Sequence, residues 1–206
     1  MIKTLARKIA IVMGAQLKVN RDQVEIFTYG LELIFGTLVQ LVLIMSLSLL
    51  VDTFITTMLC LIAFASLRFF GGGVHLSTYP LCLVIGVSLL ISLGKLATLA
   101  VNPVSLTFIS ALILLMGIYV IFRWVPAGTA KKQIRDESIR QEQRKKAFLV
   151  LTVWSVVIVM LITQKMAADA FAVILGILGS LILMTPLGYK AAKVLDSILN
   201  IAGKEV

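Results

Sequence analysis

Apolar residues run along the chain in long blocks that are separated by short polar stretches. There are six such blocks, at about 30–50, 53–69, 80–101, 104–124, 147–165 and 168–188. The hydrocarbon core of a bilayer is roughly 30 Å thick, and about 20 helical residues cross it. The second block is the shortest. The pattern predicts an all-α, polytopic membrane protein with six transmembrane helices.

The first 26 residues follow a different pattern. Apolar residues recur there at helical spacing with cations between them: Ile2, Leu5, Ile9, Val12 and Met13 alternate with Lys3, Arg7 and Lys8. This predicts an amphipathic helix that lies in the membrane interface on the cytoplasmic side. The C-terminal stretch is similar. No repeat of fixed period is found, and we expect residues 1–206 to form a single membrane-embedded domain.

Composition agrees with a membrane protein, and charge gives its orientation. The 206 residues are 60% hydrophobic with a mean hydropathy of +1.05, too apolar for a soluble globule. The net charge is +9, and the cations are concentrated in the two terminal segments and in the loop at 126–146. Only Lys165 falls on the opposite side, while Lys95 falls within the third block. The positive-inside rule therefore predicts that both termini and the loops after the second and fourth helices are cytoplasmic. Nucleic-acid binding is not indicated.

One polar stretch interrupts the apolar pattern, "FASLRFFGGGVHLSTYPLCLV" at residues 64–84. Pro80 suits the first turn of a helix, with Ser77 or Thr78 as the cap. Cys82 then falls in the first turn of the third membrane helix, where free backbone N–H groups and the helix dipole favour a thiolate. Such a position near the aqueous boundary favours a reactive cysteine.

His75 is the only histidine and precedes Cys82 by seven residues. A thiol with an imidazole beside it is a nucleophile with its base, a pair suited to chemistry on an acyl group. The alternatives are that Cys82 is a small packing residue and His75 a solvated loop residue. Ser77 is a minor alternative nucleophile. Cys60, near the middle of the second helix, is expected to be a packing residue.

Other kinds of site fit this stretch poorly. One histidine and two separated cysteines do not provide the three or four ligands that zinc usually takes. The glycines at 71–73 lack the Gly-Lys-Ser/Thr ending of a phosphate-binding loop. We therefore expect no metal and no cofactor.

The pattern formed by Arg68, Gly72, Gly73, His75 and Cys82 resembles that of the AgrB (accessory gene regulator B) family of bacterial quorum-sensing peptidases. "YGLE" at 29–32 resembles the start of the family's first membrane helix. "VPAGTAKKQIRDESIRQEQRKK" at 125–146 resembles its basic cytoplasmic loop. The Gly-Thr-Ala that follows Pro126 and Ala127 departs from the acidic or proline-containing sequence common in the family, which leaves the choice of substrate open.

The resemblance implies a multi-pass protein of the bacterial plasma membrane with catalytic His75 and Cys82. Its implied activity is that of a cysteine endopeptidase that cleaves the C-terminal tail from a small AgrD-like precursor peptide. The remaining peptide stays on Cys82 as a thioester and cyclises to a thiolactone, or to a lactone where a serine attacks. A homodimer is expected partly from the family and partly because Gly176, Gly179 and Ser180 permit close helix contacts.

Several residues are expected to support this reaction. Gly72 and Gly73 permit close backbone approach. Arg68 either orients a substrate carboxylate or carbonyl, or is an ordinary interfacial cation. Glu32 pairs with Arg68 or Lys95, helps to bind substrate, or is a surface residue. Lys131 and Lys132 either dock an acidic peptide tail or attract anionic lipids of the bilayer.

Two functions of other classes remain as alternatives. A small transporter or exporter would explain Glu32 and Lys95 within membrane segments, although the two halves of the chain show no repeat. A non-catalytic scaffold would need neither His75 nor Cys82.

Overall fold

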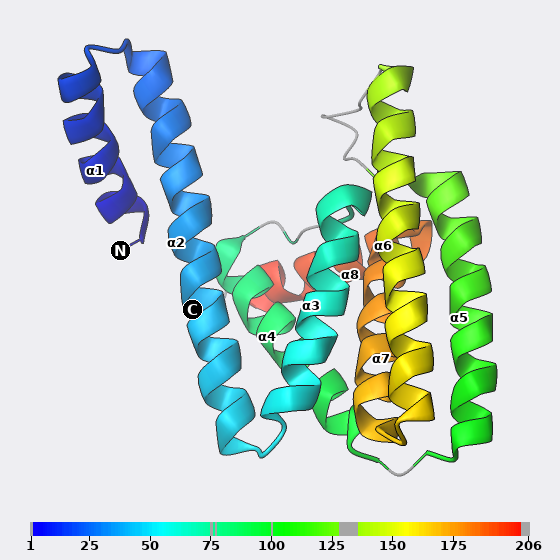
Figure 1. The fold of residues 1–206 in the computed structure, drawn as a ribbon. Helices are drawn as coiled ribbons and strands as arrows, with labels where there is room; N and C mark the ends of the chain where they lie inside the picture. The colour runs from blue at the N-terminus through cyan, green and yellow to red at the C-terminus, as the bar shows by residue number, and fades with distance from the viewer. Residues whose placement is uncertain (1, 75, 77, 100, 128–135, 203–206) are drawn as a thin grey trace. The chain divides into compact units, whose positions relative to one another are not determined.

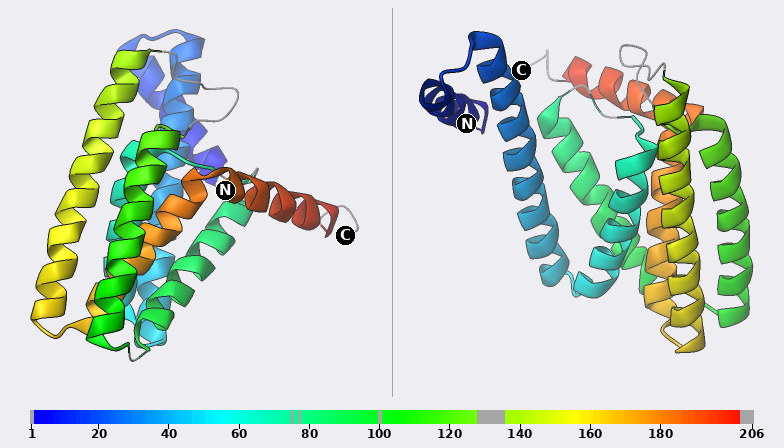
Figure 2. Two further views of the ribbon diagram at one scale, coloured as in Figure 1. Left: turned by 90° about the vertical axis from the view of Figure 1, so that its right-hand side faces the viewer. Right: turned by 45° about the horizontal axis from the view of Figure 1, so that its top comes forward.

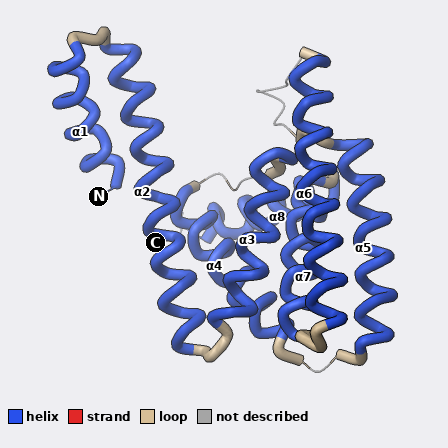
Figure 3. Tube along the Cα trace, in the orientation of Figure 1, coloured by secondary structure: helices blue, strands red, loops and turns tan. Residues whose placement is uncertain are grey.

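The computed structural model describes residues 2–74, 76, 78–99, 101–127 and 136–202. His75, Ser77, Lys131 and Lys132 lie outside the described residues. The described part contains eight helices and no strand (Figure 1, Figure 3). They are α1 (Ile2–Leu17), α2 (Arg21–Leu50), α3 (Phe54–Gly71), α4 (Tyr79–Ala97), α5 (Pro103–Trp124), α6 (Glu137–Thr163), α7 (Ala167–Met184) and α8 (Pro186–Ala202).

The six helices α2 to α7 are long and apolar enough to cross a membrane. The prediction of an all-α protein with six transmembrane helices is therefore confirmed. Their ends differ from the predicted ones, most clearly at α6, which begins at Glu137 inside the predicted loop at 126–146, and at α2, which begins at Arg21. Helix α7 ends at Met184, four residues before the predicted end. Pro186 follows that end; proline lacks an N–H and cannot continue a helix.

The ends of three helices depend on residues in the left-handed region. Lys18, Asp52 and Lys165 follow α1, α2 and α6 with φ of 52°, 54° and 63°. The next amide donates to a carbonyl five residues back: Val19 to Gly14 at 3.1 Å, Thr53 to Ser48 at 2.9 Å, and Met166 to Leu161 at 2.9 Å. These are Schellman C-caps, which satisfy carbonyls at the end of a helix.

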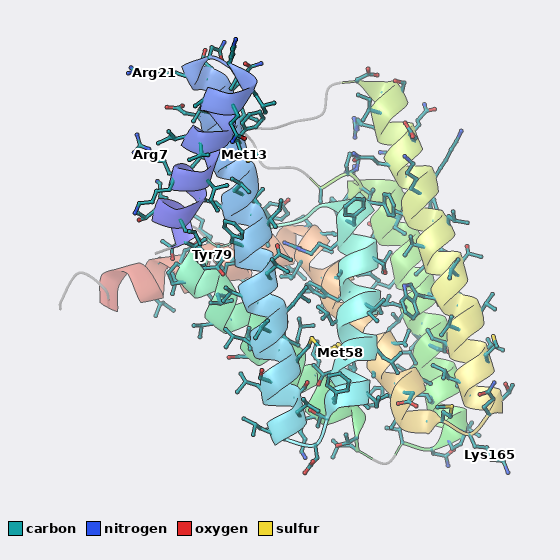
Figure 4. All side chains as sticks on the ribbon, turned by 60° about the vertical axis from the view of Figure 1, so that its left-hand side comes forward. Arg7, Met13, Arg21, Met58, Tyr79 and Lys165 are labelled. Carbon is teal, nitrogen blue, oxygen red and sulfur yellow. The ribbon has the colours of Figure 1, made fainter. Side chains whose placement is uncertain are left out.

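The chain divides into two compact units, residues 1–46 and residues 47–206, which we describe separately. In the first unit, α1 folds back beside the start of α2 (Figure 4). Ala6, Ala10 and Gly14 are buried at every fourth position of α1, and a Cβ on Gly14 would meet Val24 of α2. The segment predicted as one amphipathic helix over 1–26 is thus divided, because Asn20 and Gln23 form a capping box that starts α2.

In the second unit α7 is the central helix, and α3, α4, α5, α6 and α8 pack against it. Glycines permit the close approaches: a Cβ on Gly176 would meet the carbonyl oxygen of Cys60 on α3, and one on Gly117 would lie 3.0 Å from Leu151 on α6. Helix α8 leaves α7 at a steep angle and runs across the end of the bundle (Figure 2). The loop between α3 and α4 lies at this same end.

Candidate active site at the glycine loop

The glycines after α3 adopt a backbone that other residues rarely adopt. Gly72 has φ of 72° and Gly73 has φ of 129°. A Cβ on Gly72 would meet the carbonyl oxygen of Ala127, and a Cβ on Gly73 would meet the Arg68 guanidinium and lie 3.0 Å from the carbonyl oxygen of Leu183. Both glycines are therefore needed for their backbone conformation and for the close approach of neighbouring groups.

This loop pairs with the segment that follows α5. The Ala127 amide donates to the Gly71 carbonyl at 2.7 Å, and the Gly73 amide donates to the Ala127 carbonyl at 2.9 Å. Together they form a short parallel bridge between Gly72 and Ala127. Val125 and Pro126 connect this bridge to α5. The segment "VPA", quoted from the sequence as a family feature, thus forms backbone contacts with the glycines.

Val74 forms hydrogen bonds with α7 and with the Arg68 side chain. Its amide donates to the carbonyl of Leu183, near the end of α7, at 3.2 Å. Its carbonyl accepts a hydrogen bond from Nη2 of Arg68. The two residues directly before His75 are thus bonded to the segment after α5, to α7 and to the Arg68 side chain.

Arg68 lies in the last turn of α3 and is half-buried. Its guanidinium carbon lies 5.8 Å from the centroid of the Phe64 ring. Nη1 is buried and has no hydrogen-bond partner among the described residues. Cys82 and Tyr189 both interact electrostatically with this guanidinium. Burial raises the pKa of the Tyr189 phenol, and the charge of Arg68 acts in the opposite direction.

Cys82 lies in the first turn of α4, as predicted, and is half-buried. Thr78 occupies the N-cap position, but its side chain makes no capping hydrogen bond. The Cys82 amide donates to the Thr78 carbonyl at 3.1 Å, and Pro80 has no amide hydrogen. The Cys82 amide is thus used within the helix, and Pro80 offers none to an anion.

Cys60 differs from Cys82 in its surroundings. It is fully buried on α3, where its backbone contacts Gly176 of α7. These contacts make it part of the helix–helix packing.

Comparison with known proteins shows which family the chain belongs to. The chain matches the family "Accessory gene regulator B" over residues 6–185. It belongs to the AgrB family. Two AgrB-like proteins of Clostridium perfringens, from strains SM101 and 13, are each 23% identical over 97% of this chain and 99% of the relative. An AgrB-like protein of Halalkalibacterium halodurans is 21% identical over 97% of both chains. No solved structure matches.

AgrB membership connects this multi-pass membrane protein with the agr quorum-sensing system. The family implies an AgrD-like precursor peptide as its partner.

The sequence left Arg68 and Lys95 as possible partners of Glu32. Lys95 lies in the last turn of α4, where it is exposed, and its Nζ is 3.5 Å from the Val51 carbonyl at the end of α2. It thus lies near the end of a helix that is long and apolar enough to cross a membrane. Glu32 lies on α2 in the first unit and is half-buried. The ion pairs found in the described part of the chain are all on α6, so Glu32 takes part in none of them.

The small residues on α7 pack within the chain. Gly176 faces Cys60, Gly179 faces Phe64, and Ser180 is fully buried. These residues make their contacts within the chain, so they do not support the homodimer, which stays a prediction.

Sequence reasoning missed several residues around the glycine loop. They are Leu183, Tyr189 and Arg144, whose Nε donates to the Val125 carbonyl at 2.8 Å. Arg144 was counted only as a loop cation. Backbone contacts such as that of Leu183 leave no pattern in a single sequence.

Proposed function

We propose that this AgrB-family protein is a membrane cysteine endopeptidase that removes the C-terminal tail of an AgrD-like precursor peptide. Cys82 is the nucleophile, and His75 is its base and later the acid. The observation that supports this best is the position of Cys82, half-buried in the first turn of α4. Val74, next to His75 in the chain, is bonded to Arg68.

The chemistry proceeds in two acyl transfers. His75 takes the thiol proton as the Cys82 sulfur attacks the scissile carbonyl carbon. The C–N bond then breaks, and the amine of the tail leaves with the proton from His75. The N-terminal part of the precursor remains on Cys82 as a thioester.

Cyclisation follows when a cysteine thiolate in the precursor attacks this thioester. A new thioester, the thiolactone, forms as the Cys82 thiolate leaves, so the number and kind of bonds are unchanged. Such an exchange is nearly isoenergetic and needs no ATP if water is excluded. A serine hydroxyl in place of the thiol gives a lactone.

Arg68 has two tasks in this proposal. Its Nη2 positions the chain next to His75 through the Val74 carbonyl, and Nη1 is available to a carbonyl or carboxylate oxygen of the substrate. Gly72 and Gly73 permit the loop conformation that brings Arg68 this close.

The surroundings of the site complete the proposal. Both termini and the loops at 70–79 and 126–146 face the cytoplasm of a bacterial cell. Lys131 and Lys132 dock the acidic tail of the precursor beside a bilayer with anionic lipids, and Glu32 contributes to substrate binding. Residues 1–206 act as one membrane-embedded domain, as a homodimer, and without a metal or cofactor.

The proposal is tested by co-expression with a precursor encoded nearby, followed by mass spectrometry of the peptide. Wild-type protein should yield the shortened, cyclised peptide, whereas Cys82→Ala and Cys82→Ser should yield only intact precursor. Cys60→Ala is the matched control and should still cleave. Cleavage by Cys82→Ala would refute the peptidase and favour a transporter or scaffold.

A further inference from the structure

Arg144 differs from its basic neighbours on α6 in the contacts that it makes. Its Nε donates to the backbone carbonyl of Val125 at 2.8 Å, and its side chain is 24% exposed. Nη1 of Arg144 also lies 3.9 Å from Glu137 of its own helix. Arg140, one turn earlier, pairs with the same Glu137 at 3.4 Å and is 39% exposed. Lys146 pairs with Glu142, also on α6. Among the described cations of α6, Arg144 is the one with a hydrogen bond to another part of the chain.

The contact of Arg144 continues towards the glycine loop. Val125 is separated from Ala127 only by Pro126, whose ring fixes its φ. Ala127 exchanges two backbone hydrogen bonds with Gly71 and Gly73, at 2.7 and 2.9 Å. Gly73 is followed by Val74 and then by His75. The hydrogen bond from Arg144 to Val125 is charge-assisted. Through Pro126, Ala127 and Gly73 it is connected to Val74, the residue before His75.

The rest of α6 is held by other contacts. Ala147, Leu151 and Ile158 are buried in the apolar core. Trp154 donates from Nε1 to the Ser66 hydroxyl of α3 at 2.8 Å. Loss of the Arg144 side chain should therefore release Val125–Ala127 without detaching α6 from the bundle.

We propose that Arg144 is a positioning residue for the peptidase reaction. It fixes Val125–Ala127 and, through the pairing of Ala127 with Gly71 and Gly73, the loop that leads into His75. This inference rests on the proposed function, and it assigns to Arg144 a role in turnover rather than in substrate binding. The segment that contains Lys131 and Lys132 follows Ala127 in the sequence. The proposed docking segment therefore begins next to Val125–Ala127, which Arg144 fixes.

The test uses the full-length membrane protein with Arg144→Gln and the matched control Arg140→Gln. Each variant receives the precursor peptide and, separately, the same precursor as a C-terminal thioester at the cleavage point. A thiolate leaving group needs no proton, so the thioester reports on Cys82 without the acid function of His75. For Arg144→Gln we expect kcat for the peptide to fall about 10- to 100-fold, the range for loss of a hydrogen bond to a charged group. KM for the peptide and capture of the thioester on Cys82 should stay within about twofold of wild type.

Arg140→Gln should leave kcat for the peptide unchanged, and Arg144→Lys should recover part of it. An effect confined to KM, an equal loss on both substrates, or the same loss in Arg140→Gln would each overturn the inference.

Hydrogen exchange at the Gly73 amide gives a readout that does not depend on activity. This amide is bonded to Ala127, so its exchange should become faster in Arg144→Gln and not in Arg140→Gln. Unchanged exchange in Arg144→Gln would refute the positioning role even if kcat fell. Faster exchange in a protein that cleaves no precursor would instead refute the proposed function and leave the structural link intact.

Discussion

Arg68 donates from Nη2 to the carbonyl oxygen of Val74, the residue that directly precedes His75. The sequence left open whether this arginine contacts substrate or only anchors a helix end. The bond to Val74 gives it a third role, because it connects the last turn of α3 to the chain beside the expected base. Nη1 is buried and has no described partner, and it is the donor that we propose for substrate.

We predict that Arg68→Gln lowers kcat for precursor cleavage about 10- to 100-fold, because a hydrogen bond to a charged group is lost. Arg68→Lys should restore little of this, since one ammonium cannot replace the two nitrogens of a planar guanidinium. Arg123→Gln, which removes an exposed cation near the end of α5, is the control and should cleave normally. Steady-state kinetics in vesicles or detergent would measure all three. A wild-type kcat in Arg68→Gln would mean that the hydrogen bond from Arg68 to Val74 is not needed for cleavage.

Gly72→Ala and Gly73→Ala should each reduce both stability and cleavage. The backbone conformation alone costs an alanine about 1–3 kcal/mol, and the new Cβ would collide with Ala127 at one position and with Arg68 at the other. Gly30→Ala is the control: its Cβ would meet nothing within 4 Å, and alanine in a helix is about 1 kcal/mol better than glycine. Thermal unfolding and a cleavage assay on the same preparations would measure these effects. An unaffected Gly72→Ala would mean that the bridge to Ala127 is dispensable.

The long apolar blocks were sufficient to predict six membrane helices, because length and hydropathy decide which segments can span a bilayer. The helix ends were harder, since Lys18, Asp52 and Lys165 adopt the left-handed conformation usually taken by glycine. The first turn of α4 was predictable from Pro80, and with it the place of Cys82. The bonds that hold the glycine loop were not, because they join backbone groups of Ala127 and Leu183 that are remote in sequence.

The orientation in the membrane can be tested with single cysteines introduced at the two ends of α6. We expect Glu137→Cys to react with a membrane-impermeant thiol reagent only after the cells are opened, because the basic loop is predicted to be cytoplasmic. Lys165→Cys, at the turn into α7 and at the opposite end of the second unit from Tyr79 (Figure 4), should react in intact cells. A Cys60→Ala, Cys82→Ala background removes the native thiols. The reverse labelling pattern would place the proposed site on the opposite side of the membrane from a cytoplasmic precursor.

Neutralising Lys131 and Lys132 together should raise KM for the precursor more than it lowers kcat. Docking of an acidic tail contributes equally in the ground state and the transition state, so its loss weakens uniform binding. The difference from wild type should become smaller as salt is added, because exposed charges are screened over about 8 Å at physiological ionic strength. A fall in kcat alone would place these lysines in the chemical step. Titration with precursors that have an acidic or a neutralised tail would separate the two cases.

His75→Ala should separate the two halves of the reaction. Expulsion of an amine requires a proton, which His75 is proposed to supply, whereas exchange between two thiols does not. Cleavage of the peptide bond should therefore fall by a factor of about 10²–10⁴, the usual contribution of general acid–base catalysis. Exchange with a thiol leaving group does not need this proton, so capture of a precursor thioester on Cys82 should remain close to the wild-type rate. The measurement is covalent capture by purified His75→Ala protein, followed by mass spectrometry with both substrates and with Cys82→Ala as the blank. A comparable loss on both substrates would mean that His75 is needed to deprotonate the thiol or to hold the loop, and the assignment of the leaving-group proton to His75 would be wrong.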